Sequence, residues 1–407
     1  MIIWLRQRRS RVLRLGKAAL SAAVFLLCCN SAVLAAPKPP PNPLEITAPD
    51  PLLPQSAVNQ PLSAQERLEL KAALDELNTQ ATAQLQAGNA TAAFEIWHRE
   101  LRLRRALGTL DEVEALGRVG ETAWRENQKA EVQLITGRLQ SIKAEAKGKS
   151  PIDSALLVAL GQAYQQVRSP EPALEVYQQI LADARLRQDA ATVQATLKTM
   201  AELQLAWFDY KAATATYEEL LTLARAQGES ADRVVYLQQL AYIYDKTKQP
   251  QYALKAKLEV AQSYESNQNV EQLPALKIAI ASDYEALEQP NEARLEYQAA
   301  YELAISRQQF AYASEALGKL GALYRANNQP DTALQVYQVL LQVFEQTYNS
   351  YELMNTYDRI GQIYLELKDI DRSLEAFQKG LELAKSLQDR ESYFTERIER
   401  VNQQRQQ

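Results

Sequence analysis

The sequence repeats itself every forty residues from about residue 150 onward. A glycine or alanine recurs at this interval, and an apolar residue precedes it each time. Twelve residues after each small residue stands an alanine or serine, and four positions further on an aromatic residue stands in five of the six repeats. A fixed period of this kind indicates a protein built from stacked, similar units. The small residues of the register are Gly161, Ala201, Ala241, Ala281, Gly321 and Gly361.

Each repeat has the pattern of two packed helices. Leu157, Leu160 and Tyr164 are spaced as neighbours on one face of a helix. Ala173 and Tyr177 are spaced to form the answering face of a second helix. The small residue lets the two helices approach closely, and the tyrosine ring fills the space beside it. The pattern predicts an all-α chain in which each helix pair is covered by the next pair.

This spacing of Leu, Gly or Ala, Tyr, then Ala and Tyr or Phe resembles the tetratricopeptide repeat (TPR), here in a long form with forty residues in place of the usual thirty-four. The resemblance implies a TPR-type α-solenoid, a right-handed superhelix of antiparallel helix pairs. Two divergent repeats precede the six regular ones, so we expect about eight repeats and a C-terminal capping helix. The predicted segments are a signal peptide at 1–36, a Pro-rich spacer at 37–62, two divergent repeats at 63–149, six regular repeats at 150–389 and a capping helix or tail at 390–407.

The N-terminal segment has the pattern of an export signal. Six Arg and Lys residues precede an apolar run from Ala18 to Ala36 that contains no acidic residue, and small residues end the run. A secretory translocase recognises this order of charge and apolarity. The alternative is an uncleaved signal anchor, because a run of this length can just span a bilayer. Either alternative predicts an exported protein in the periplasm or another extracytoplasmic compartment.

Composition argues against catalysis and against nucleic-acid binding. The chain has one histidine, His98, and its two cysteines, Cys28 and Cys29, both lie in the N-terminal apolar run. One histidine and two cysteines confined to the apolar run are too few for a catalytic triad or a cysteine-based metal site. We therefore predict no enzyme and no cofactor. His98 is predicted to be a structural or surface residue. The formal net charge is −5, and removal of residues 1–36 would make it more negative, which disfavours a nucleic-acid footprint.

The TPR resemblance implies a concave groove lined by outward positions of the first helix in each pair. These positions differ from repeat to repeat while the core positions stay alike. We expect the groove to hold an extended or helical peptide segment with apolar anchors and some basic character. The alternative is that exposed positions simply vary without function. The candidate groove residues are Lys198, Glu202, Leu205, Gln238, Tyr242, Asp245, Ile278, Glu285, Arg325 and Asp358.

Two functions follow from these features. The first is an exported scaffold that binds a protein or peptide and assists assembly or docking of a membrane complex; its overall plan resembles periplasmic TPR assembly factors. Membrane contact would then come only through an uncleaved anchor or through the membrane-complex partner. The second is a Mn²⁺ or Ca²⁺ delivery or buffering protein, because Glu202, Asp245, Glu285 and Asp358 carry hard oxygen ligands.

Overall fold

The computed structural model describes residues 42–45, 50–53, 61–147, 153–266 and 269–405. The chain divides into two compact units, residues 1–48 and 49–407, and every described helix belongs to the second. The predicted signal peptide or anchor lies outside the described residues, as does most of the predicted Pro-rich spacer. Among the helices that are described, none is long and apolar enough to cross a membrane.

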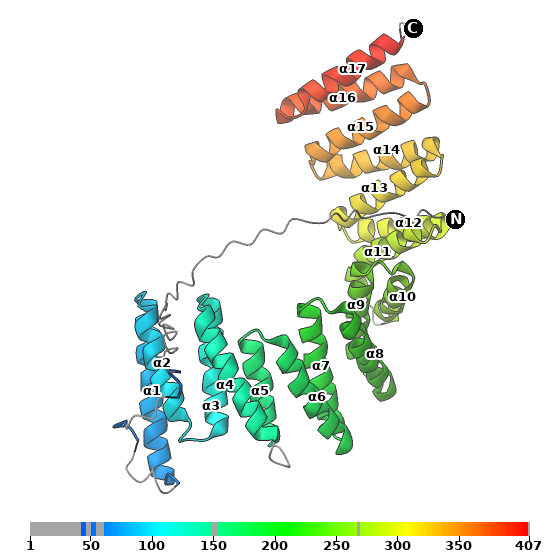
Figure 1. Cartoon of the computed structure of the whole chain (residues 1–407). Helices are drawn as coiled ribbons and strands as arrows, with labels where there is room; N and C mark the ends of the chain where they lie inside the picture. The colour runs from blue at the N-terminus through cyan, green and yellow to red at the C-terminus, as the bar shows by residue number, and fades with distance from the viewer. Residues whose placement is uncertain (1–41, 46–49, 54–60, 148–152, 267–268, 406–407) are drawn as a thin grey trace, which may run out of the picture. The chain divides into compact units, whose positions relative to one another are not determined.

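The second unit is a succession of antiparallel helix pairs (Figure 1). Its described residues form seventeen α-helices, one 3₁₀ helix and no strand. We call the first helix of each pair the A helix and the second the B helix. The eight pairs are α1 (Ala64–Gln86) with α2 (Ala90–Arg104), α3 (Thr109–Arg125) with α4 (Lys129–Lys147), α5 (Ser154–Gln166) with α6 (Pro170–Leu186), α7 (Ala190–Ala206) with α8 (Tyr210–Gln227), α9 (Ser230–Lys246) with α10 (Pro250–Ser266), α11 (Leu273–Ala286) with α12 (Pro290–Ser306), α13 (Phe310–Ala326) with α14 (Pro330–Gln346) and α15 (Ser350–Glu366) with α16 (Ile370–Leu387). The 3₁₀ helix η2 (Val270–Gln272) precedes α11, and α17 (Glu391–Arg405) follows the last pair. The predicted all-α solenoid with eight helix pairs and a C-terminal helix is confirmed.

Short turns of one recurring geometry join the helices. Among the described residues from Arg168 to Gln388, a residue with left-handed backbone recurs every twenty residues, and in this series only Gly228 is a glycine. At the first of these turns, the Ser169 N–H donates to the Tyr164 carbonyl over 2.9 Å and closes the helix end. The turn therefore fixes helices of nearly equal length, and two such helices make the forty-residue period.

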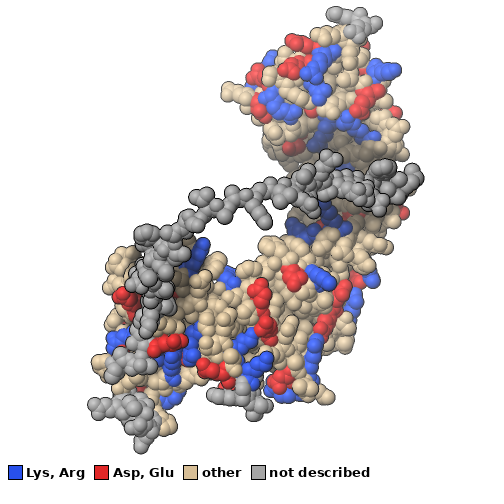
Figure 2. Space-filling view, viewed as in Figure 1, with Lys and Arg blue, Asp and Glu red and all other residues tan. Residues whose placement is uncertain are grey.

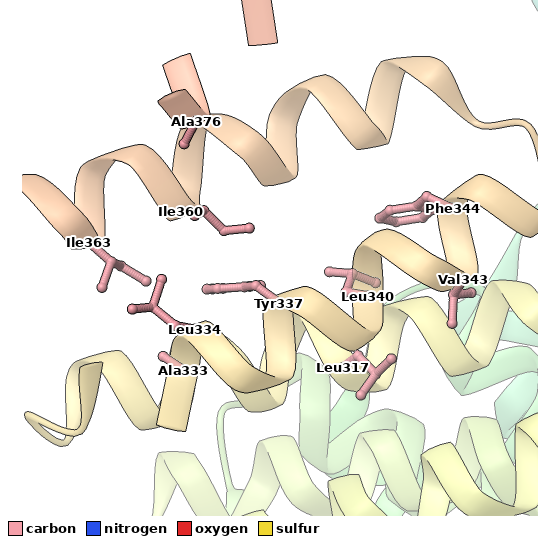
Figure 3. Packing of buried hydrophobic residues seen from close by; sticks show 10 residues of the cluster. All are labelled: Leu317, Ala333, Leu334, Tyr337, Leu340, Val343, Phe344, Ile360, Ile363 and Ala376. Atoms are coloured by element: carbon pink, nitrogen blue, oxygen red, sulfur yellow. The ribbon is translucent and has the colours of Figure 1, made fainter. Parts of the chain in front are cut away.

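The core follows the small and aromatic positions of the register. A Cβ atom added at Gly321 would lie 2.7 Å from the Tyr337 ring, so only glycine permits this approach of α13 to α14. A Cβ atom added at Gly361 would likewise lie 2.7 Å from the Phe377 ring. Figure 3 shows how one such core continues into the next pair, because residues of α14 meet residues of α13, α15 and α16. Its buried members are Leu317, Ala333, Leu334, Tyr337, Leu340, Val343, Phe344, Ile360, Ile363 and Ala376.

One buried position of the register holds a lysine in place of an aromatic residue. Lys257 stands where the other regular repeats have Tyr or Phe, and it is buried between α9, α10 and α11. Its Nζ donates to Asp245 Oδ1 over 2.8 Å and to Asp283 Oδ2 over 2.9 Å. The contact between the fifth and sixth pairs thus includes an ion-paired cluster where the neighbouring repeats use an aromatic ring.

The last helix closes the end of the array. The Phe394 ring of α17 is fully buried against Gly380, where an added Cβ would lie 2.3 Å from the ring. The Tyr393 hydroxyl lies 3.0 Å and 3.1 Å from the two carboxylate oxygens of Asp358. Asp358 was predicted to line the groove. That prediction is corrected, because the Tyr393 contact buries this carboxylate beneath the capping helix.

Candidate functional site

Five predicted groove residues come together between α7 and α9. Lys198, Glu202 and Leu205 of α7 face Gln238 and Tyr242 of α9 across a hollow of about 510 Å³. We call this hollow the α7–α9 groove. Its other lining residues are Ala206, Tyr217, Val235, Tyr236 and Gln239.

The floor of the α7–α9 groove is aromatic and its rim is accessible. Tyr217 of α8 and Tyr236 of α9 are buried, with ring centroids 6.2 Å apart. Burial, with a smaller contribution from Glu202, raises the pKa of Tyr217 to about 12, so its hydroxyl stays protonated at neutral pH. On the rim, Tyr242 is 44% exposed and Val235 is 45% exposed. The groove therefore offers open apolar contact above a buried, uncharged floor.

The charged residues of the α7–α9 groove are available to a partner. Lys198 and Glu202 are exposed, and neither forms an ion pair or hydrogen bond within the described part of the chain. Lys246 lies over the exposed Tyr242 ring, with its Nζ 5.3 Å from the ring centroid. The Gln238 amide is oriented by Tyr264 of α10, because its Nε2 donates to the Tyr264 hydroxyl over 2.7 Å.

A second hollow, of about 970 Å³, lies along α13, α14 and α15. Arg325, the predicted groove residue here, is ion-paired with Glu366 of α15, so one arginine is already neutralised. Arg359 also lines this hollow and forms no ion pair within the described residues. Gly318 leaves room for it, since an added Cβ would lie 3.8 Å from the Arg359 Nη1 atom. Six charged side chains line this hollow, whereas two line the more apolar α7–α9 groove.

The remaining predicted residues are not in either hollow. Ile278 was predicted to be exposed in the groove. That prediction is corrected, because Ile278 is buried in a cluster with residues of α12 and α13, among them Tyr297 and Leu320. Asp245 is paired with Lys257. Glu285 accepts a hydrogen bond from the Tyr297 hydroxyl.

Sequence reasoning missed the apolar rim residue Val235 and the buried floor of the α7–α9 groove. Val235 lies seven residues before Tyr242 and thus on the same helix face, a signal that the sequence contained. Tyr217 and Tyr236 were harder to predict, because their place beneath the groove depends on how three helices pack.

The carboxylates proposed as metal ligands lie on separate helices. Glu202 lies on α7, Asp245 on α9, Glu285 on α11 and Asp358 on α15. The described residues contain no group of three or more His, Cys, Asp or Glu side chains that could hold a metal ion. His98, the single histidine, is partly buried, with its Nε2 2.6 Å from Glu131 Oε2, and so links α2 to α4.

The fold and the grooves define a repeat solenoid of the class that presents extended surfaces to other molecules. Residues 312–386 match the family model described as tetratricopeptide repeat. This match covers the last two helix pairs, and the other described pairs have the same helix–turn–helix architecture. Repeats of this family form generally non-catalytic scaffolds that bind proteins or peptides.

Several solved structures resemble parts of the chain. BtubC from P. vanneervenii is 18% identical, with 54% of this chain and 92% of that chain covered and a TM-score of 0.38. Aspartyl phosphate phosphatase F from Bacillus subtilis is 15% identical over 71% and 78%, with a TM-score of 0.41. TPR-like repeats of a Podosopora anserina kinesin light chain are 20% identical over 47% and 94%, with a TM-score of 0.36. These similarities carry no argument about function. No curated protein matches the sequence.

Proposed function

We propose that this chain is an exported docking scaffold that holds a peptide segment of a partner protein in the α7–α9 groove. The observation that carries the proposal is the convergence of five sequence-predicted positions on one accessible hollow with an aromatic floor. Exposed Tyr242 and Val235 offer apolar contact that a partner could cover, and aromatic side chains of this kind dominate binding energy at protein interfaces.

The charges of the groove indicate the chemistry of the segment. Glu202 is exposed and without an ion-pair partner in the described chain, so a Lys or Arg of the segment can approach it. An apolar side chain of the same segment would lie against Tyr242 and Val235. Lys198 is also exposed and can pair with an acidic residue of the segment. The preferred ligand is a segment with an apolar anchor next to a basic residue that pairs with Glu202.

The N-terminal sequence supports a role outside the cytoplasm. Its basic residues and apolar run have the order of an export signal, and the chain after them is rich in proline before the repeats begin. We propose that the scaffold works at the outer face of a membrane, in the assembly or docking of a membrane complex. No observation in the described residues favours the metal-delivery alternative.

A selection from a random peptide library on the immobilised full chain tests the proposal. Peptides with an apolar and a basic residue should be enriched, and their affinity can be measured by fluorescence anisotropy. Tyr242→Ala should weaken binding at least about tenfold, as expected for truncation of an aromatic anchor. Glu202→Lys should reject the basic peptides by charge repulsion and favour acidic ones.

Tyr348→Ala is the matched control, because Tyr348 is also an exposed tyrosine but lies on the turn between α14 and α15. It should bind the enriched peptides as the wild type does. The proposal is wrong if no peptide class is enriched, or if enriched peptides bind the Tyr242 and Tyr348 variants equally well.

A further inference from the structure

We call the turns that follow A helices in the second to fifth pairs, each taken with the adjoining helix ends, the turn edge: residues 124–129, 167–171, 207–211 and 246–250. Exposed aromatic rings stand at two of these turns, in the second and fourth pairs. Trp124 is 50% exposed, Trp207 is 46% exposed and Phe208 is 72% exposed. Phe208 has a φ of 61°, in the left-handed region where glycine or asparagine is favoured. Its exposed ring gains little packing that would offset this backbone cost. Trp207 and Phe208 stand on the turn after α7, and Trp124 stands in the last helical turn of α3. All three lie outside both the α7–α9 groove and the larger hollow along α13 and α15.

Each of these four turns also carries a cation without an ion-pair partner. Lys129, Arg168, Lys211 and Lys248 are exposed, and none forms an ion pair within the described residues. The Arg168 guanidinium lies over the Trp124 ring, 4.8 Å from its centroid, so the turns of two successive pairs meet here. The cations are therefore interleaved with the aromatic rings along the turn edge.

The acidic residues of the turn edge offset this charge only in part. Glu126 is paired with Arg125 at 3.4 Å, and the Asp209 carboxylate accepts the Ala212 N–H as the cap of α8. Glu171 lies in the first turn of α6, where the helix dipole favours a negative charge. A positive edge thus exists on a chain whose formal net charge is −5.

The turns on the opposite edge, which follow B helices, differ in this respect. Arg187 is paired with Asp183 at 2.6 Å, and Arg307 is paired with Glu271 at 3.1 Å. Unpaired cations next to exposed tryptophan are thus a feature of the turn edge. Figure 2 shows that both signs of charge are interspersed with uncharged residues over the face in view, so charge composition alone would not single out an edge.

We propose that the turn edge binds the surface of a bilayer that contains anionic lipids. Tryptophan and phenylalanine on turn tips can enter the headgroup region, where aromatic rings are favoured. The unpaired cations complement the negative lipid headgroups, and each adds attraction near the surface. The N-terminal segment supports a bilayer as the occupant, since both interpretations of it, signal peptide and anchor, bring the chain to a membrane.

Vesicle binding of the full chain tests this surface. Flotation compares vesicles of phosphatidylcholine alone with vesicles that also contain phosphatidylglycerol, and brominated lipids report contact through quenching of tryptophan fluorescence. A triple variant, Arg168→Gln/Lys211→Gln/Lys248→Gln, should bind the anionic vesicles more weakly by about a hundredfold. Replacement of Trp207 by Phe should remove part of the quenched emission, while buried Trp97 stays unquenched.

The control variant carries Leu186→Ser, which removes an exposed apolar side chain from the opposite edge. It keeps the same N-terminal segment, so any binding by that segment is equal in all variants. The proposal predicts wild-type binding for the control and weaker binding for Trp207→Ser/Phe208→Ser. It is overturned if the triple variant binds as the control does, if brominated lipid leaves Trp124 and Trp207 unquenched, or if the edge binds an oligonucleotide in preference to the vesicles. Peptide binding in the α7–α9 groove is measured separately and does not depend on this outcome.

Discussion

At the scale of single residues, the helix pair depends on a small residue opposite an aromatic ring. Gly321 and Gly318 both lie in α13, which makes them a matched pair. The Cβ of an alanine at position 321 would lie 2.7 Å from the Tyr337 ring, whereas at position 318 its neighbours lie at 3.8 Å and 3.9 Å.

Gly321→Ala should therefore destabilise the protein by about 1–3 kcal/mol through overpacking. Gly318→Ala should be neutral or stabilising by up to about 1 kcal/mol, because alanine is the better helix former. Urea unfolding of both variants measures the difference. Equal stabilities would show that the ring of Tyr337 moves aside at little cost.

The buried cation is a second residue-scale feature. Burial raises the pKa of Asp283 above its ordinary value of 3.8, although the hydrogen bond from Lys257 acts in the opposite direction. A carboxyl whose pKa is raised by folding contributes stability that is present below about pH 3.8 and is lost as pH rises through the folded-state pKa. Lys257 limits this loss by pairing with the ionised form.

Lys257→Met should cost about 3–5 kcal/mol at neutral pH, because it leaves the buried Asp283 charge unpaired. The cost should shrink near pH 4, where the carboxyl can take a proton. Thermal unfolding at the two pH values measures this change. The double variant Lys257→Met/Asp283→Asn should recover much of the stability at neutral pH. If Lys257→Met lost the same stability at both pH values, an unpaired Asp283 charge would not be the cause.

At the scale of the element, the helices end in a left-handed residue that is seldom glycine in this chain. Tyr348 has a φ of 55° and is 91% exposed, so its ring contributes little packing while its backbone conformation carries a cost. The conformation is retained because the turn hydrogen bond from the Asn349 N–H to the Phe344 carbonyl, at 2.9 Å, closes the end of α14.

Tyr348→Gly should stabilise the protein by about 0.5–1 kcal/mol, because glycine adopts the left-handed region without a steric penalty. Tyr348→Ala removes the ring equally but keeps the penalty, so it should show no gain. The two midpoints in chemical denaturation give the comparison. A glycine variant no more stable than the alanine variant would show that this turn is not strained.

At the scale of the whole molecule, the described helices pack against their neighbours in the array, so stability should be distributed locally. Phe394→Ala would open the interface between α16 and α17, at a cost of about 3–5 kcal/mol for a buried aromatic side chain. Amide hydrogen exchange should then accelerate in α15–α17 and remain unchanged in α1–α4. Faster exchange over the entire array would instead indicate one cooperative unit.

The sequence by itself determined the repeat, its helix pairs and their number. These features are periodic along the chain, and the hydrophobic period of a helix is a local property. The positions of Lys198, Glu202, Leu205, Gln238 and Tyr242 could be predicted as outward for the same reason, and they share one groove. The role of that groove remains a prediction.

Only the tertiary structure decided which outward positions are covered. Asp358 has the same register position as Lys198, yet Tyr393 of α17 buries the aspartate while the lysine is exposed. Ile278 has this register position too, and the packing around α11 buries it. Lys257 is accommodated in the core only because Asp245 and Asp283 approach it from two other helices. Burial depends on side chains that come from distant parts of the chain, and a local period carries no information about them.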